Sequence, residues 1–150
     1  MKKKFTLIAL IAIIATAGVS AQDSGFGAGL IFGSPTGLSL KKWTGESTAI
    51  DAGIAWNFQN NGFFNIHADY LRHNFNLISV SKGKMAFYYG LGAKLGFGND
   101  FRLTARVPLG LDYMFESSPF DIFVEVVPGL GILPALDFDW DAGIGVRYFF

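Results

Sequence analysis

The strongest constraint in this sequence is an alternation of apolar residues with polar or small residues that runs from residue 25 to residue 150. Within 101–115 every odd position is apolar or aromatic, whereas the even positions include Arg102, Arg106 and Asp112. Successive side chains of a β-strand point to opposite faces, so this period of two predicts strands with one apolar and one polar face. No helical period interrupts the series, and the sequence therefore predicts an all-β fold.

The alternation recurs in eight segments that are bounded by turn-forming residues. The expected strands are 25–32, 37–43, 49–58, 63–72, 85–97, 101–115, 120–127 and 138–150. The connections are short enough for sequential antiparallel hairpins. Eight such strands close into an up-and-down barrel, which leaves no free sheet edge.

Alternation alone does not say whether the apolar face points into or out of the barrel. A soluble lipocalin-like barrel would turn it inward, and an outer-membrane barrel would turn it toward lipid. The outward direction is favoured by a polar face rich in Gly, by a nearly uncharged apolar face and by aromatic residues near the strand ends. The interface aromatics are expected to be Phe26, Phe32, Trp43, Trp56, Phe58, Phe64, Tyr70, Phe97, Phe101, Tyr113, Phe115, Phe120, Tyr148 and Phe150. We predict an eight-stranded antiparallel up-and-down transmembrane β-barrel.

The first residues have the parts of an export signal. Lys2, Lys3 and Lys4 precede an apolar run over 5–17 and small residues at 19–21. The run is shorter than the roughly 20 residues that span a bilayer. We expect cleavage after Ala21 and one barrel domain over 22–150. Removing three lysines from 12 basic residues leaves 9 against 12 acidic residues, and this net charge of −3 does not suggest nucleic-acid binding.

The polar face carries charges that are expected to point into the lumen and to compensate one another. They are Lys41, Asp51, His67, Asp69, Lys94, Arg102, Arg106, Asp112, Asp121, Glu125 and Arg147. Charges in a narrow, poorly hydrated lumen are tolerable when they are paired and hydrogen-bonded. Eight strands enclose a space that side chains fill. We therefore expect a salt-bridged plug, with a conducting or catalytic lumen as the alternative.

Candidate catalytic and metal-binding patterns in this sequence are weak. Ser39, Asp51, His67 and Asp69 share the inward face, but no nucleophile-elbow motif surrounds the serine. His67 and Asp69 alone are too few ligands for a metal site, and the chain has no Cys. The glycine-rich stretch 25–29 is followed by no helix, so it does not predict a phosphate site. We expect no catalytic residue, no metal and no cofactor.

Pro108 and Pro128 lie in strand-like runs, where a closed barrel has no free edge to accept them. If Phe115 and Phe120 face one another, Pro108 lies opposite Val127 and next to Pro128. Either the chain forms a bulge there or the seventh strand ends early and a loop begins at Pro128, or the barrel wall has a lateral gap near Pro108 and Pro128. Outer-membrane lipid acyltransferases resemble the second case in using side openings flanked by proline.

Five stretches carry a resemblance to a known class: "GSPTGLSLKKW" (33–43), "AIDAGIAW" (49–56), "VPLGLDYMF" (107–115), "DIFVEVVPGLGILP" (121–134) and "GIGVRYFF" (143–150). Their layout resembles the small eight-stranded bacterial outer-membrane barrels of the outer-membrane protein A and X class, and more closely a group of short uncharacterised barrel proteins. The resemblance implies residence in the outer membrane and contact with its lipid. It also implies that the aromatic last strand, with Tyr148 and Phe150, is a signal for the outer-membrane insertion machinery. It brings no catalytic or ligand motif.

These observations predict an integral outer-membrane barrel, porin-like in architecture and monomeric, with a structural or interaction role and no enzymatic activity. Both termini would lie on the periplasmic side, and the external connections would be short, which argues against an adhesin or a protease. Two alternatives remain open. The first is a barrel that handles lipid or a small apolar ligand, with or without enzymatic activity, through a gap near Pro108 and Pro128. The second is a soluble periplasmic lipocalin-like binder.

Overall fold

A computed structural model of the chain describes residues 25–34, 36–57 and 63–150. The expected signal segment, and Phe58 among the expected interface aromatics, lie outside these residues. Within the described part of the chain, no helix is long and apolar enough to cross a membrane. Every regular element described is a β-strand, in agreement with the predicted all-β fold.

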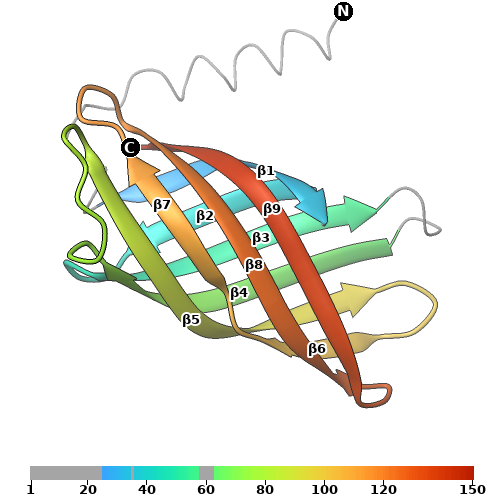
Figure 1. Ribbon diagram of the computed structural model, residues 1–150. Coiled ribbons are helices and arrows are strands. Elements are labelled where there is room, and N and C mark those ends of the chain that lie inside the picture. The colour runs from blue at the N-terminus through green and yellow to red at the C-terminus, as the bar shows by residue number, and fades with distance from the viewer. Residues whose placement is uncertain (1–24, 35, 58–62) are drawn as a thin grey trace, which may run out of the picture.

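Nine strands are arranged as in Figure 1. They are β1 (Phe26–Ser34), β2 (Gly37–Trp43), β3 (Thr48–Asn57), β4 (Phe63–Asn74), β5 (Lys84–Phe97), β6 (Arg102–Arg106), β7 (Leu109–Met114), β8 (Phe120–Leu133) and β9 (Asp137–Phe149). The expected strand over 101–115 is divided into β6 and β7. The expected strand over 120–127 is longer than predicted, because β8 continues through Pro128 to Leu133.

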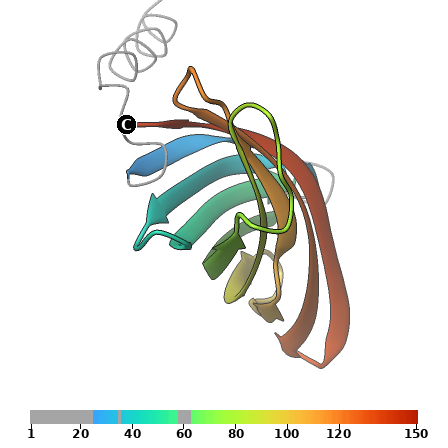
Figure 2. The same ribbon diagram turned by 60° about the vertical axis from the view of Figure 1, so that its left-hand side comes forward.

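The nine strands occupy eight positions in a closed antiparallel ring. Both β6 and β7 pair with β5 on one side and with β8 on the other, so they are two parts of one interrupted strand. The last strand, β9, pairs with β1 from Gly27↔Phe149 to Ser34↔Ala142 and closes the ring. The predicted eight-position up-and-down barrel is confirmed, and Figure 2 shows its strands curving around a common lumen.

The pairing registers give the ring a shear of ten residues. Starting at Gly29 and moving from partner to partner through β2, β3, β4, β5, β6 and β8, the register arrives at Asp137 in β9. Gly29 itself pairs with Arg147, ten residues further along β9. With about 3.3 Å per residue and about 4.8 Å between strands, eight strands with this shear tilt by about 40°. Such a barrel has an interior that side chains fill.

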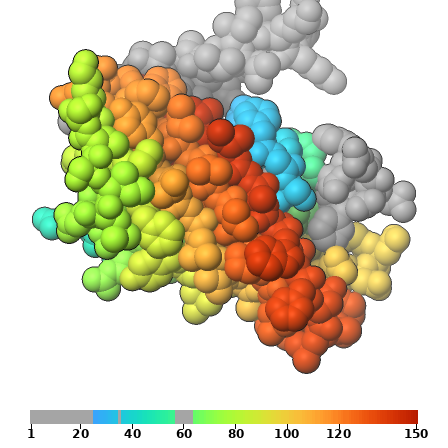
Figure 3. All heavy atoms as spheres, in the orientation of Figure 1, coloured from blue at the N-terminus to red at the C-terminus, as the bar shows by residue number. Residues whose placement is uncertain are grey.

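The two faces of the sheet have opposite polarity. In β8, Asp121, Phe123, Glu125 and Val127 are buried, whereas the alternate residues Phe120, Ile122, Val124 and Val126 are exposed. Exposed apolar side chains therefore cover the outer surface of β8 and β9, which is orange and red in Figure 3. Glycines make room for large inward side chains: a Cβ on Gly27 would lie 2.8 Å from Cζ of Phe149.

The prediction that places Trp43 at an outer interface is wrong. Trp43 has the same parity as Lys41 in β2, so its ring points inward and is 5% exposed. The ring centroid lies 4.3 Å from Lys41 Nζ and 4.5 Å from the centroid of His73. A cation and a second aromatic ring inside the lumen therefore hold this indole.

Pro108 and Pro128 interrupt the ladder between strands but do not shift its register. The pairs Arg106↔Gly129 before the break and Leu109↔Val126 after it belong to the same register, which is the register expected from the sequence. Between them, Val107 N–H donates to the carbonyl of Pro128 at 2.9 Å. The carbonyl of Pro108 accepts a hydrogen bond from Gly90 N–H at 3.0 Å. The expectation of a loop starting at Pro128 is wrong, because β8 continues to Leu133 and stays paired with β9 through Pro128↔Trp140.

The barrel wall is not equally tall all round. The end that holds Phe26 and Phe150, here called the terminal end, also holds the connections 44–47, 75–83 and 115–119. At the opposite end, β9 residues 137–141 extend beyond the last pair with β1, Ser34↔Ala142. The wall is therefore taller at the β8–β9 hairpin than at β1, as Figure 2 shows.

Hydrogen exchange tests the closure at the prolines. We expect the Val107 amide to exchange slowly, because it donates within the barrel wall. The Leu77 amide belongs to the connection 75–83, and its side chain is 64% exposed; it is the fast-exchanging reference. The measurement is residue-resolved exchange in detergent micelles, and equal rates at the two amides would contradict a closed wall.

Candidate functional site

The lumen contains a connected network of charged side chains. Nine of the eleven polar residues expected there are less than 9% exposed: Lys41, Asp51, His67, Asp69, Arg106, Asp112, Asp121, Glu125 and Arg147. Lys94 is partly buried, with its side chain 12% exposed. Arg102 differs from the expectation. Its side chain is 55% exposed and pairs with Asp137 at 3.8 Å, because β6 begins at the rim of the opposite end.

Arg147 of β9 is the centre of the network near the terminal end. Its Nε donates to Asp121 Oδ1 at 3.0 Å, and its second terminal nitrogen donates to Asp121 Oδ2 at 2.8 Å. The guanidinium also reaches Asp51 Oδ2 at 3.4 Å and Asp112 Oδ2 at 3.5 Å. Its Cζ lies 3.9 Å from the ring centroid of Phe123. A planar guanidinium with five donors suits this position, where one cation meets three carboxylates.

Lys41 of β2 is the member of the network nearest the terminal end of the barrel. Its Nζ donates to Asp112 Oδ2 at 2.5 Å and lies 2.8 Å from His73 Nε2. An ammonium group only donates hydrogen bonds, so Nε2 of His73 is the acceptor and carries no proton. His73 is therefore a neutral partner here, and Trp43 covers the lysine from the other side.

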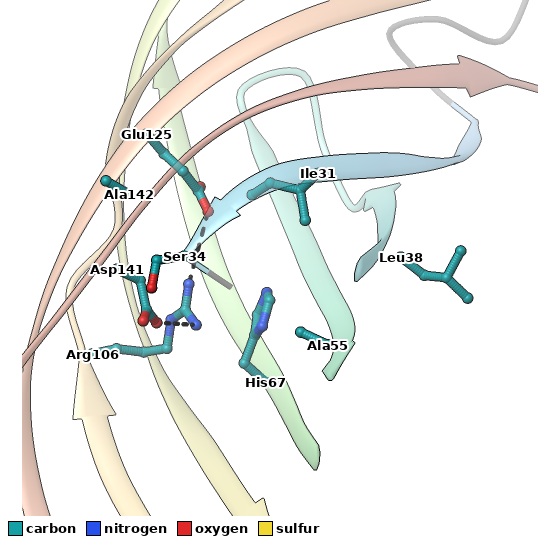
Figure 4. Close-up of a pocket in the computed structure, with 9 residues that line it drawn as sticks. All are labelled: Ile31, Ser34, Leu38, Ala55, His67, Arg106, Glu125, Asp141 and Ala142. Carbon is teal, nitrogen blue, oxygen red and sulfur yellow. Dashed lines mark ion pairs between the residues drawn. The ribbon is translucent and has the colours of Figure 1, made fainter. Parts of the chain in front are cut away.

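Arg106 of β6 is the second centre. Its Nε lies 3.1 Å from Asp69 Oδ1, and its terminal nitrogens lie 3.6 Å from Asp141 Oδ2 and 3.9 Å from Glu125 Oε1. Tyr88 of β5 donates to Glu125 Oε2 at 2.8 Å. Figure 4 shows the ion pairs of Arg106 with Glu125 and Asp141, beside a small cavity that His67 also lines.

Lys94 of β5 carries the network to the opposite end. Its Nζ donates to Asp139 Oδ2 at 2.5 Å and to Asp141 Oδ2 at 2.8 Å. Asp141 also faces Arg106. Pairs thus follow one another from Lys41 at the terminal end to Lys94 at the opposite end.

Sequence reasoning missed four members of this network: His73, Tyr88, Asp139 and Asp141. Asp139 and Asp141 share the odd parity of Arg147, and Tyr88 shares the even parity of Lys94. His73 was assigned to a connection, whereas β4 extends to Asn74 and points His73 inward with His67 and Asp69. Parity within correctly bounded strands would have found all four.

Ser39, Asp51, His67 and Asp69 do share the lumen, as their parity predicts. Ser39 is 5% exposed, but the ion-pair partners of His67 are the carboxylates Asp51 and Asp69. The His67 imidazole therefore faces two carboxylates. This arrangement does not orient an imidazole toward a serine nucleophile.

Replacing Arg147 tests the network. Arg147→Leu removes the cation from three buried carboxylates, and breaking such a buried pair costs about 3–5 kcal/mol. We expect a fall of that size in the free energy of unfolding, measured by urea titration of the folded barrel in detergent. The matched control is Arg102→Leu at the exposed rim, with an expected change of at most about 1 kcal/mol. Equal effects would show that burial of the network does not determine stability.

Comparison with known proteins identifies a structural neighbour. No protein-family model and no curated protein matches the sequence. The fold is similar to the crystal structure of the N-terminal β-barrel domain of OprF from Pseudomonas aeruginosa, with a TM-score of 0.53 and 17% sequence identity. The match covers 83% of this chain and 95% of that chain. At this identity the likeness shows the fold, which agrees with the barrel class that the sequence resembles.

Proposed function

We propose that this protein is an integral outer-membrane β-barrel with a filled lumen and a structural or interaction role that involves no catalysis. One observation carries the proposal: the polarity of the barrel is reversed relative to a soluble protein. Its inward face holds buried charges, and its outward face holds exposed apolar side chains.

The outward face is too apolar for a water-exposed surface. Large apolar side chains on neighbouring strands are about half exposed or more, for example Leu30 of β1 at 45%, Val124 of β8 at 47% and Ile144 of β9 at 55%. Soluble monomers rarely expose contiguous apolar patches larger than a few hundred Å². A barrel in lipid instead requires such a band, with aromatic residues at its edges. Phe64–Phe97 and Phe120–Tyr148, with ring centroids 6.1 and 5.1 Å apart, are pairs of this kind.

The structure favours this function over the two alternatives. A lipocalin-like binder needs an apolar lumen, whereas here the lumen contains the network around Arg147 and Arg106. A lipid-handling barrel with a gap near Pro108 and Pro128 is disfavoured by the hydrogen bond from Val107 N–H to the carbonyl of Pro128 and by the flanking pairs Arg106↔Gly129 and Leu109↔Val126. The similarity in fold to the N-terminal β-barrel domain of OprF is consistent with the outer membrane as the location proposed for this chain.

A substitution on the outward face tests insertion in lipid. Val124→Arg places a charge between Leu111 and Ile144 on the apolar band. If this band contacts lipid, the free energy of unfolding in lipid vesicles falls by about 2–4 kcal/mol. The matched control is Val80→Arg in the connection 75–83, where little change is expected.

Fractionation and bilayer recordings complete this test. We expect the wild-type chain in the outer-membrane fraction, with heat-modifiable gel mobility, and without steady conductance in a planar bilayer. Recovery of folded protein from the soluble periplasmic extract would contradict the membrane location. A steady conductance would contradict the filled lumen.

We further propose that Tyr148 and Phe150 are recognised by the outer-membrane insertion machinery. Their rings form an outward cluster at the terminal end: Tyr148 lies 5.1 Å from Phe120 and 5.4 Å from Phe150, and Phe150 lies 6.2 Å from Phe26. Tyr148→Ala is expected to slow assembly into vesicles that contain the machinery. The control is Tyr113→Ala, which changes a tyrosine of β7 near the same terminal end of the barrel. Equal slowing by both variants, or by neither, would contradict a specific signal.

A further inference from the structure

Three metal-ligating side chains of the lumen network converge, among the residues that the structure describes. Asp51 of β3 and His67 and Asp69 of β4 offer ligand atoms that all lie within 4.8 Å of one another, and all three residues are buried. His67 Nε2 lies 3.4 Å from Asp51 Oδ1 and 3.9 Å from Asp69 Oδ2. Donor atoms at about 2.0–2.2 Å from one ion lie roughly 3–4 Å apart. We propose that Asp51, His67 and Asp69 bind a divalent first-row transition metal ion, with Zn²⁺ as the probe.

Two polar atoms of this cluster are buried without a hydrogen-bond partner. Asp51 Oδ1 is buried without a hydrogen-bond partner, although the residue is only 4% exposed. The other ring nitrogen of His67, Nδ1, is also buried without one. Leaving a buried acceptor unsatisfied costs about 1–3 kcal/mol, and more for a charged group. A cation coordinated by Asp51 Oδ1 and His67 Nε2 would remove the cost at the carboxylate.

The surrounding arginines are arranged as outer-shell partners of a metal site. Asp51 directs Oδ2 to Arg147 and Oδ1 to His67. Asp69 directs Oδ1 to Arg106 and Oδ2 to His67. Each carboxylate is thus held on one oxygen by a guanidinium while its other oxygen faces the histidine. Outer-shell hydrogen bonds and ion pairs of this type orient carboxylate ligands in metalloproteins.

The charge of the lumen also favours a bound cation. Among the described residues, five carboxylates and three cationic side chains are buried: Asp51, Asp69, Asp112, Asp121 and Glu125 against Lys41, Arg106 and Arg147. With all five carboxylates ionised and the histidines neutral, the excess is two negative charges. His73 does not offset them, since its Nε2 accepts from Lys41. One divalent ion at His67 would balance this excess in a medium where unpaired charge is costly.

The position of His67 is held by Gly53, its partner in the β3–β4 register. A Cβ on Gly53 would lie 2.8 Å from His67 Nε2, so the imidazole occupies space that only glycine leaves free. His67 also lines a cavity of about 10 Å³, together with Ser34 and Ala142 (Figure 4). This volume holds about one water molecule or ion.

The donor set selects the class of metal. One imidazole nitrogen and two carboxylate oxygens, without thiolate, suit Zn²⁺, Fe²⁺ or Mn²⁺. Ca²⁺ takes six to eight oxygen ligands, which two carboxylates beside an imidazole do not supply.

The test uses the full chain, folded in detergent and freed of metal by chelation. Zn²⁺ alone is titrated by calorimetry, and bound metal is counted by elemental analysis. We expect one Zn²⁺ per chain, no comparable binding of Ca²⁺, and affinity weakened more than about tenfold in His67→Gln. The matched control is His73→Gln, which changes the other lumen histidine and is expected to keep the wild-type stoichiometry.

A second variant keeps the proposal testable if His67→Gln fails to show the heat-modifiable mobility of a folded barrel. Gly53→Ala retains all three ligands but displaces the His67 ring, and it is expected to weaken Zn²⁺ binding with little change in folding. Absence of a stoichiometric site in the wild type would overturn the proposal. So would unchanged affinity in a folded His67→Gln or Gly53→Ala protein, or equal losses in His67→Gln and His73→Gln.

Discussion

The interaction on which this barrel depends is the pairing of Arg147 with the carboxylates around it. The guanidinium makes two short hydrogen bonds to Asp121 and reaches Asp51 and Asp112 across the lumen. These four residues belong to β9, β8, β3 and β7, so one side chain joins distant parts of the ring. A charge buried in this way is stable only when its partners are all in place. The ring and its interior therefore depend on one another.

Closure of the ring makes that pairing possible. The β8–β9 register places Asp121 opposite Arg147. Closure pairs Arg147 with Gly29 of β1, and its guanidinium then reaches Asp51 and Asp112 across the lumen. Glycines on the inward face let large side chains cross the lumen, as Gly27 does for Phe149 and Gly53 for His67. The filled interior and the proposed metal site result from the same geometry. Asp51, His67 and Asp69 lie where the clusters of Arg147 and Arg106 meet, and each aspartate belongs to one of these clusters.

The prolines show how local rules and the whole barrel interact. Pro108 and Pro128 each lack an amide donor, and local reasoning predicted either an early end of the strand or a lateral gap. The structure retains the register, because Val107 N–H and the carbonyl of Pro108 still pair on either side. The pairs beyond the break, Leu109↔Val126 and Arg106↔Gly129, hold the two strands together. A missing donor therefore divides β6 from β7 without opening the wall.

The alternation of residue types by itself determined the eight strand positions, their antiparallel order and the face to which nearly every side chain points. That information is local, since the direction of a side chain in a strand depends only on its parity. Parity placed Arg147, Asp121 and Asp51 in the lumen, and it failed where strand bounds or residue type misled, as for His73 and Trp43. Only the tertiary structure decided which inward side chains meet. The contacts of Arg147 with Asp51 and Asp112 across the lumen follow from shear and closure, which depend on pairings between residues far apart in the chain. The convergence of Asp51 with His67 and Asp69 follows from the register of β3 and β4, in which Asp51 pairs with Asp69.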